Sequence, residues 1–98
     1  MDKNIVKACA GIVGAKISVE PYASAVAQAE SKIGVDFAPE AEKARKDLVQ
    51  AVKKNLANRK ENPYSALKEK YNLPVGKNYF TKEKKKFCYA LAKSLKMI

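Results

Sequence analysis

Apolar and polar positions recur along the last third of the chain with the period of an α-helix. With about 100° between successive residues, one side of a helix over residues 78–98 carries large apolar side chains and the opposite side is basic. The apolar side consists of Phe80, Phe87, Leu91, Leu95 and Ile98, and the opposite side of Lys82, Lys86, Tyr89, Lys93 and Lys96. The pattern predicts a helix that buries one side and presents the other to solvent or to a partner.

A shorter helix and a turn are predicted immediately before this segment. Asn62 followed by Pro63 is typical of a helix start, with Asn as the cap and Pro in the first position. The run LPVG at residues 73–76 ends that helix, because the residue before Pro is disfavoured in the helical region and Gly tolerates positive φ. Asn78 can then cap the final helix. In outline the unit resembles a helix-turn-helix, in which the second helix would enter a major groove, although many such corners serve packing alone.

A first helix is predicted from apolar residues that recur at helical spacing after Asp2, which can serve as its cap. Gly11 and Gly14 each cost about 1 kcal/mol relative to Ala in a helix. Their presence predicts either a close crossing with another helix or a break. An alternative for residues 12–19 is a β-strand, because this stretch is rich in β-branched side chains.

Two further helices precede residue 61. Pro21 suits the first turn of a small Ala-lined helix that Gly34 would stop, and we expect this helix to pack against the first or the third one. Residues 39–60 form the longest predicted helix, with an apolar stripe of Ala41, Ala44, Leu48, Val52 and Leu56.

Together these elements predict an all-α fold, a small bundle of about five helices with a C-terminal helix-turn-helix-like unit. The chain has 98 residues, of which 47% are hydrophobic and 31% are charged, and this composition suits a single folded domain over residues 1–98. We expect the core to contain Phe80, Phe87, Leu91 and Leu95 of the last helix together with Leu48, Val52 and Leu67.

Positive charge is concentrated in the second part of the chain. The net charge is +10; residues 1–40 hold four lysines against five acidic residues, and residues 41–98 hold sixteen basic against five acidic residues. The domain therefore has a near-neutral, Ala-rich part, residues 1–38, and a basic part, residues 39–98. Such an asymmetry commonly marks a surface for nucleic acid, an anionic membrane or an acidic protein, the alternative being a solvated surface that aids solubility.

The sequence offers little for catalysis or metal binding. It contains no His, and Cys9 and Cys88 do not form a CxxC pair, so a zinc site is not expected. We predict that both thiols are free and buried, as in a reducing cytosol. Lys84 is the one titratable residue that we place on the apolar stripe of the last helix, and we expect its amine to reach solvent. The prediction is a binding protein that is not an enzyme and uses no cofactor or metal.

One stretch carries a family resemblance. The run YNLPVGKNYF at residues 71–80, continuing to KKFCYAL at residues 85–91, resembles a segment of small uncharacterised proteins from phages and mobile elements of Firmicutes. The resemblance covers about the last third of the chain. It implies a prophage or mobile element as the genetic neighbourhood and no catalytic activity. A signal-peptide pattern is absent, and we expect a soluble protein in the cytoplasm of a bacterial host cell.

The candidate binding residues fall into two groups. The first, which we name the lysine ridge, consists of Lys77, Lys82, Lys85, Lys86, Tyr89, Lys93 and Lys96. The second, the 53–60 cluster, consists of Lys53, Lys54, Arg59 and Lys60 near the end of the third predicted helix. Cations at a helix C-terminus stabilise it by about 0.3–1 kcal/mol each, so the 53–60 cluster has a structural explanation as good as a functional one.

The lysine ridge favours a nucleic-acid partner, either RNA or DNA. Ammonium groups along one side of a helix neutralise phosphates and release counterions, and an exposed tyrosine can stack on an unpaired base. Because bidentate reading of guanine favours Arg and the ridge has none, we expect binding with little sequence specificity.

Three other partners are compatible with a basic surface. The protein could dock on a host or phage protein and inhibit a nucleic-acid-handling defence enzyme, as anti-CRISPR proteins do, or it could be a virion or assembly component. Binding to a membrane surface is the least favoured alternative, because the lysine ridge has no exposed apolar flank once Phe87 and Leu91 are buried.

Overall fold

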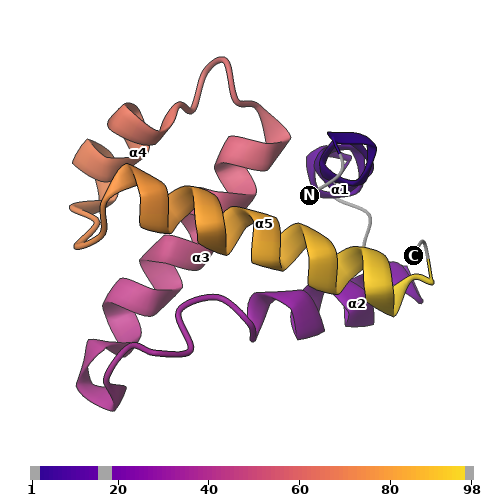
Figure 1. The fold of residues 1–98 in the computed structure, drawn as a ribbon, viewed down its shortest axis with the longest axis horizontal. Coiled ribbons are helices and arrows are strands. Elements are labelled where there is room, and N and C mark those ends of the chain that lie inside the picture. Colours follow the sequence, from indigo (N-terminus) through magenta and orange to yellow (C-terminus); the bar gives the residue numbers. More distant parts are fainter. Residues whose placement is uncertain (1–2, 16–18, 97–98) are drawn as a thin grey trace.

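The computed structural model describes residues 3–15 and 19–96, and the regular elements within these ranges are all helical (Figure 1). They are α1 (Lys3–Gly14), α2 (Tyr22–Glu30), α3 (Glu42–Ala57), α4 (Tyr64–Tyr71) and α5 (Lys77–Ser94), with a short 3₁₀ helix, η1 (Pro39–Ala41), directly before α3. The predicted all-α bundle of about five helices is confirmed.

α5 is the helix around which the others are arranged. It packs against α1, α2 and α3, and α3 in turn packs against α1 and α4. In Figure 1, α5 crosses in front of α3, α2 runs alongside it, and α1 is seen nearly end-on. One side of α5 is therefore covered by other helices, and the opposite side faces solvent.

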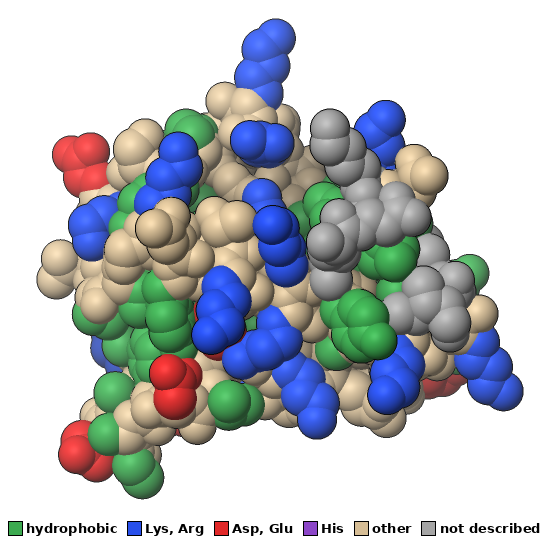
Figure 2. Space-filling view, viewed as in Figure 1, with side chains coloured by type: hydrophobic (Ala, Val, Ile, Leu, Met, Phe, Trp, Pro, Cys, Tyr) green, Lys and Arg blue, Asp and Glu red, His purple; other side chains and the backbone are tan. Residues whose placement is uncertain are grey.

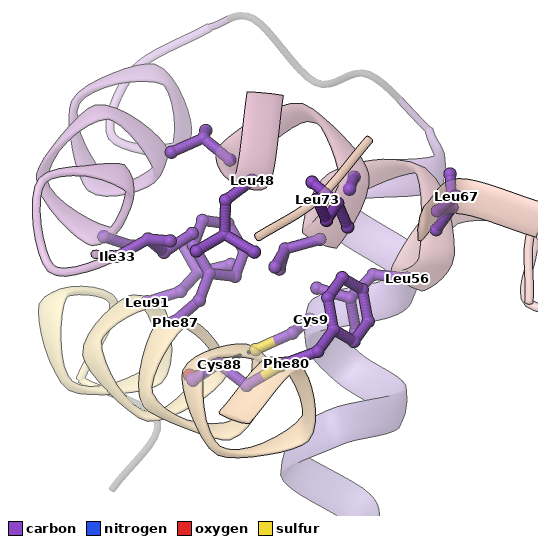
Figure 3. Close-up of a cluster of buried hydrophobic side chains, with 14 of the residues drawn as sticks. Cys9, Ile33, Leu48, Leu56, Leu67, Leu73, Phe80, Phe87, Cys88 and Leu91 are labelled. Carbon is purple, nitrogen blue, oxygen red and sulfur yellow. Dashed lines mark hydrogen bonds between the residues drawn. The ribbon is translucent and has the colours of Figure 1, made fainter. Parts of the chain in front are cut away.

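Apolar side chains from all five helices meet in one core (Figure 3). Six of the seven predicted core residues are buried in it: Leu48, Val52, Leu67, Phe80, Phe87 and Leu91. Burying one such side chain contributes roughly 1.5–3 kcal/mol. Leu95 is only half-buried, because α5 ends at Ser94, and Ile98 lies outside the described residues.

The start of α1 and the linker after it bear on two predictions. The proposed cap Asp2 lies outside the described residues. Residues 16–18 of the alternative strand, predicted over residues 12–19, lie outside them as well. Residues 12–14 are helical, so the strand is wrong for this stretch. A Cβ atom placed on Gly14 would lie 3.5 Å from the carbonyl oxygen of Ala57, whereas one on Gly11 would meet nothing within 4 Å. α1 therefore meets the end of α3 at Gly14, where a Cβ atom would make an ordinary van der Waals contact, and the predicted close crossing is wrong at Gly11.

The second helix packs differently from our expectation. α2 lies mainly against α5, where Ala25 and Ala29 are buried, and not mainly against α1 or α3. α2 ends at Glu30, and Gly34 sits in the following turn with a positive φ of 64°. In this turn the N–H groups of Lys32 and Ile33 bond to carbonyls three residues back, and the Ile33 side chain is fully buried.

Both predicted asparagine caps are wrong. Pro63 and Gly76 are the N-cap residues of α4 and α5, and neither helix start has a side-chain cap hydrogen bond. Asn62 instead offers its backbone carbonyl to the Asn55 side chain at 2.8 Å. Asn78 lies inside α5, because the carbonyl of Gly76 already accepts the first helical hydrogen bond, from the Phe80 N–H.

The connection between α4 and α5 turns through an asparagine. Asn72 adopts φ 52° and ψ 51°, and the N–H of Leu73 bonds to the carbonyl of Lys68, an arrangement typical of a helix end with a left-handed residue. Gly76, which we expected to supply the positive φ, has a φ of −81°. The helix-turn-helix outline is present, but α4 packs mainly on α3.

The longest helix is α5 and not α3, contrary to our prediction. α3 ends at Ala57 rather than near residue 60 and has 16 residues, whereas α5 has 18. The chain leaves α3 at Asn58, whose side-chain oxygen accepts the N–H of Glu61 and so favours a turn there. α5 is therefore the longest α-helix of the described chain.

Candidate nucleic-acid interface

The central part of the lysine ridge, from Lys82 to Lys93, lies on the solvent side of α5, as predicted. Lys77 is the first residue of α5. Lys96 lies beyond the helix end at Ser94 with a positive φ of 57°, so the helix is shorter than predicted. Lys77, Lys82, Lys85, Lys93 and Lys96 are exposed, and Lys86 is half-buried. The Tyr89 side chain is 50% exposed, so it is free to contact a partner. The opposite side of the helix buries Phe87, Cys88 and Leu91. The helical phase assigned from the sequence is correct.

Basic side chains form a band over this face of the molecule (Figure 2). The band follows α5 and continues toward the connection between α3 and α4, while acidic side chains on this face lie mainly toward its margins. Of the six ridge lysines, only Lys86 forms an ion pair within the described part of the chain. The positive charge of the ridge is therefore largely uncompensated.

Glu83 is the residue of α5 that sequence reasoning missed. It is 1% exposed, its Oε1 accepts the N–H of Gly34 at 2.8 Å, and its Oε2 lies 2.9 Å from the Lys86 Nζ. The carboxylate joins the turn after α2 to α5 and holds Lys86 against the protein. Position 83 borders the apolar stripe, but the partner N–H is 49 residues away, so the sequence alone gave no sign of this bond.

A second contact fixes the same turn. The Tyr79 hydroxyl donates to Asp36 Oδ1 at 2.5 Å, and this bond, with help from the charges of Lys86 and Lys82, lowers the pKa of the Asp36 carboxyl. Burial and the same hydrogen bond raise the pKa of Tyr79. The exposed carboxylate of Asp36 thus already accepts a hydrogen bond from a tyrosine.

Lys84 is less exposed than we expected. Its Nζ donates to Asn55 Oδ1 at 2.9 Å, and the side chain is half-buried instead of extending to solvent. Burial lowers the pKa of Lys84, and the positive charge of Arg59 lowers it further. Asn55 is 4% exposed and can hold the amine because its amide group is itself fixed by Asn62.

The 53–60 cluster divides into two pairs. Lys53 Nζ lies 2.7 Å from Glu30 Oε1, and Lys54 Nζ lies 5.1 Å from the centre of the Tyr71 ring, so these two cations stabilise contacts of α3 with α2 and α4. Arg59 and Lys60 are exposed in the connection after α3. The first pair is thus engaged within the protein, and the second is exposed to solvent.

Neither cysteine takes part in the interface. Cys9 and Cys88 are free and buried, as predicted, and the Cys9 thiol donates to the backbone carbonyl of Cys88 at 3.2 Å (Figure 3). Within residues 3–15 and 19–96, no group of three Cys, Asp or Glu side chains is placed to hold a metal ion. No helix in the same ranges is long and apolar enough to cross a membrane.

No family model, no curated protein and no solved structure matches the chain. The candidate interface is therefore defined by its geometry and charge.

Proposed function

We propose that the protein binds nucleic acid through the phosphate backbone, along the lysine ridge of α5. The observation that carries the proposal is the set of five exposed ridge lysines that have no ion-pair partner among the described residues. Bringing phosphates to these lysines releases the counterions of the nucleic acid and relieves the mutual repulsion of the ammonium groups.

The dimensions of the ridge favour a long polyanion. The 18 residues of α5 span roughly 27 Å at about 1.5 Å per residue. A small acidic metabolite could meet only one or two of the lysines, whereas a nucleic-acid strand presents a phosphate to each of them.

The residue types of the ridge bear on what kind of nucleic acid it binds. α5 contains no Arg, so reading of base edges in a duplex is not supported, and contacts to phosphates dominate. Tyr89, exposed among the lysines, can stack on a base that is not paired. We therefore favour single-stranded RNA or DNA over a duplex.

The salt dependence of binding tests the proposal. If roughly four to six phosphates are contacted, log K for a duplex falls against log salt with a slope of about −4 to −5, and a single strand gives a slightly shallower slope. Fluorescence anisotropy with labelled single-stranded and duplex oligonucleotides measures both slopes.

Absence of binding at low salt, in a protein that circular dichroism shows to be folded, contradicts the proposal. The ridge would then suit the acidic surface of a protein, including the inhibitor of a defence enzyme considered above. Retention of a partner from native host extract after nuclease treatment supports that alternative. The origin in a phage or mobile element and the cytoplasmic location stay predictions.

A further inference from the structure

A cavity of about 240 Å³ lies where the end of α3 meets the starts of α4 and α5. Its walls include the cations Arg59, Lys77 and Lys84, the hydroxyls of Ser65 and Thr81, and the amide of Asn55. We name it the Lys84 cavity. None of the residues that line it is acidic.

The amine of Lys84 is held in place in this cavity and keeps N–H donors that can bind a ligand. A lysine ammonium has three N–H donors, and the bond to Asn55 Oδ1 uses one of them. Asn55 is buried, and its own amide donates to the Asn62 carbonyl, so the position of the amine is set by the protein. The lowered pKa of Lys84 agrees with a cation that has been desolvated without receiving a counter-charge.

Two helices begin at the cavity, and their first turns favour an anion, as the three cations do. α4 begins at Tyr64 and α5 at Lys77, and both residues line the cavity. Neither helix start is capped by a side chain. The N–H groups of a first helical turn carry partial positive charge and lack intrahelical acceptors, which favours an anion near them.

The cavity continues onto the lysine ridge. A neighbouring hollow is lined by Lys77, Asn78, Thr81, Lys82 and Lys85 and shares Lys77 and Thr81 with the Lys84 cavity. A strand whose end lies in the cavity can therefore follow the ridge lysines without leaving the basic surface.

We propose that the Lys84 cavity binds the terminal phosphate of a nucleic-acid strand, a phosphomonoester, an inference that rests on the proposed function. Three cations, two hydroxyls and two helix starts match a group with three free oxygens and a charge of about −1.5 to −2 at pH 7. An internal phosphodiester has one negative charge and needs room for the chain on both sides, so a strand end fits the cavity better.

Binding of matched oligonucleotides tests the proposal. One sequence is prepared with a 5′-phosphate, with a 3′-phosphate and with hydroxyls at both ends, and its affinity is measured by anisotropy. We expect one phosphorylated form to bind about tenfold more tightly than the hydroxyl form, as expected from one or two added charge-assisted hydrogen bonds.

Substitutions test whether the preference for a phosphorylated end arises in the Lys84 cavity. Arg59→Gln and Thr81→Val should abolish it. Arg59 is exposed, and Val has nearly the same shape as the half-buried Thr81, so both variants should fold. Lys84→Met is a secondary variant, because it leaves the buried oxygen of Asn55 without its donor. Lys46→Gln is the matched control: it removes one exposed charge from the earlier part of α3 and should retain the preference.

The outcomes distinguish this inference from the proposed function. Equal affinity for all three oligonucleotides overturns the terminal-phosphate site and leaves the ridge intact. Failure of every oligonucleotide to bind at low salt overturns the proposed function as well. A nucleoside monophosphate that shifts the amide signals of Ser65 and Thr81, without any preference among oligonucleotides, would assign the cavity to free nucleotides and contradict the strand end.

Discussion

Single side chains of α5 have separable roles, because the helix places residues of different function next to each other. Tyr89 is half exposed and Phe87 is fully buried, although both are aromatic and only two positions apart. Lys86 and Lys93 are both cationic, but among the described residues Lys86 forms an ion pair, with Glu83, and Lys93 does not. A substitution in α5 therefore tests either binding or folding, according to which side of the helix it alters.

Tyr89→Ala should weaken binding of single-stranded nucleic acid by about 1–3 kcal/mol through lost stacking and leave the salt slope unchanged. Lys93→Ala, on the same side, should reduce the slope by about 1. Anisotropy titrations over a range of salt measure both effects. Unchanged affinity in both folded variants would show that the ridge is an ordinary solvated surface and leave Arg59 and Lys60 as the remaining candidates.

Glu83→Gln should lower the free energy of unfolding by about 1–3 kcal/mol, because it removes the negative charge opposite Lys86 while keeping an oxygen for Gly34. Urea unfolding measures the loss. The control is Glu69→Gln on the exposed surface of α4, which should change little. A loss as small as that of the control would show that the pair with Lys86 contributes nothing measurable.

The contact between Asp36 and Tyr79 predicts a response to acid. The hydroxyl of Tyr79 and nearby lysines lower the pKa of the Asp36 carboxyl below its ordinary value of 3.8. Its contribution is complete above the unfolded pKa and is lost as the pH falls through the lower, folded pKa. Unfolding measured between about pH 2 and pH 6 should show a smaller acid dependence in Tyr79→Phe. An identical dependence in wild type and variant would contradict this role of the hydroxyl.

At the scale of whole elements, α5 unites the core and the candidate interface. It contacts three other helices with its apolar side, so its position depends on the packing of the entire bundle. The ridge residues from Lys77 to Lys93 are presented by a helix whose opposite side is buried, and not by a loop. Such a support keeps the spacing of the lysines constant, which suits contacts to a regular backbone.

Phe87→Ala should reduce the free energy of unfolding by about 3–5 kcal/mol, since the ring is fully buried and the space it leaves cannot close completely. Tyr89→Ala is the natural control, as an aromatic of the same helix that faces solvent. Chemical denaturation of both variants measures the difference. A small loss for Phe87→Ala would mean that α5 is peripheral to the core.

At the scale of the molecule, features that depend on a repeated pattern were predictable and those that depend on one distant partner were not. Helical periodicity identified the core side of α5 and its exposed ridge. The bond of Glu83 to Gly34 joins residues 49 positions apart, and the Lys84 cavity draws on three helices. Neither follows from local spacing. The cap residues Pro63 and Gly76 were missed because asparagine, proline and glycine each occur at more than one position around a helix start.

The buried contact between Cys9 and Cys88 gives the protein an internal reporter. Both thiols are shielded from solvent while the core is packed. Separation of α1 from α5 would expose both thiols to an alkylating reagent, so the rate of labelling reports this opening. Mass spectrometry after brief alkylation would follow this opening without any added probe, in the free protein and in the presence of nucleic acid.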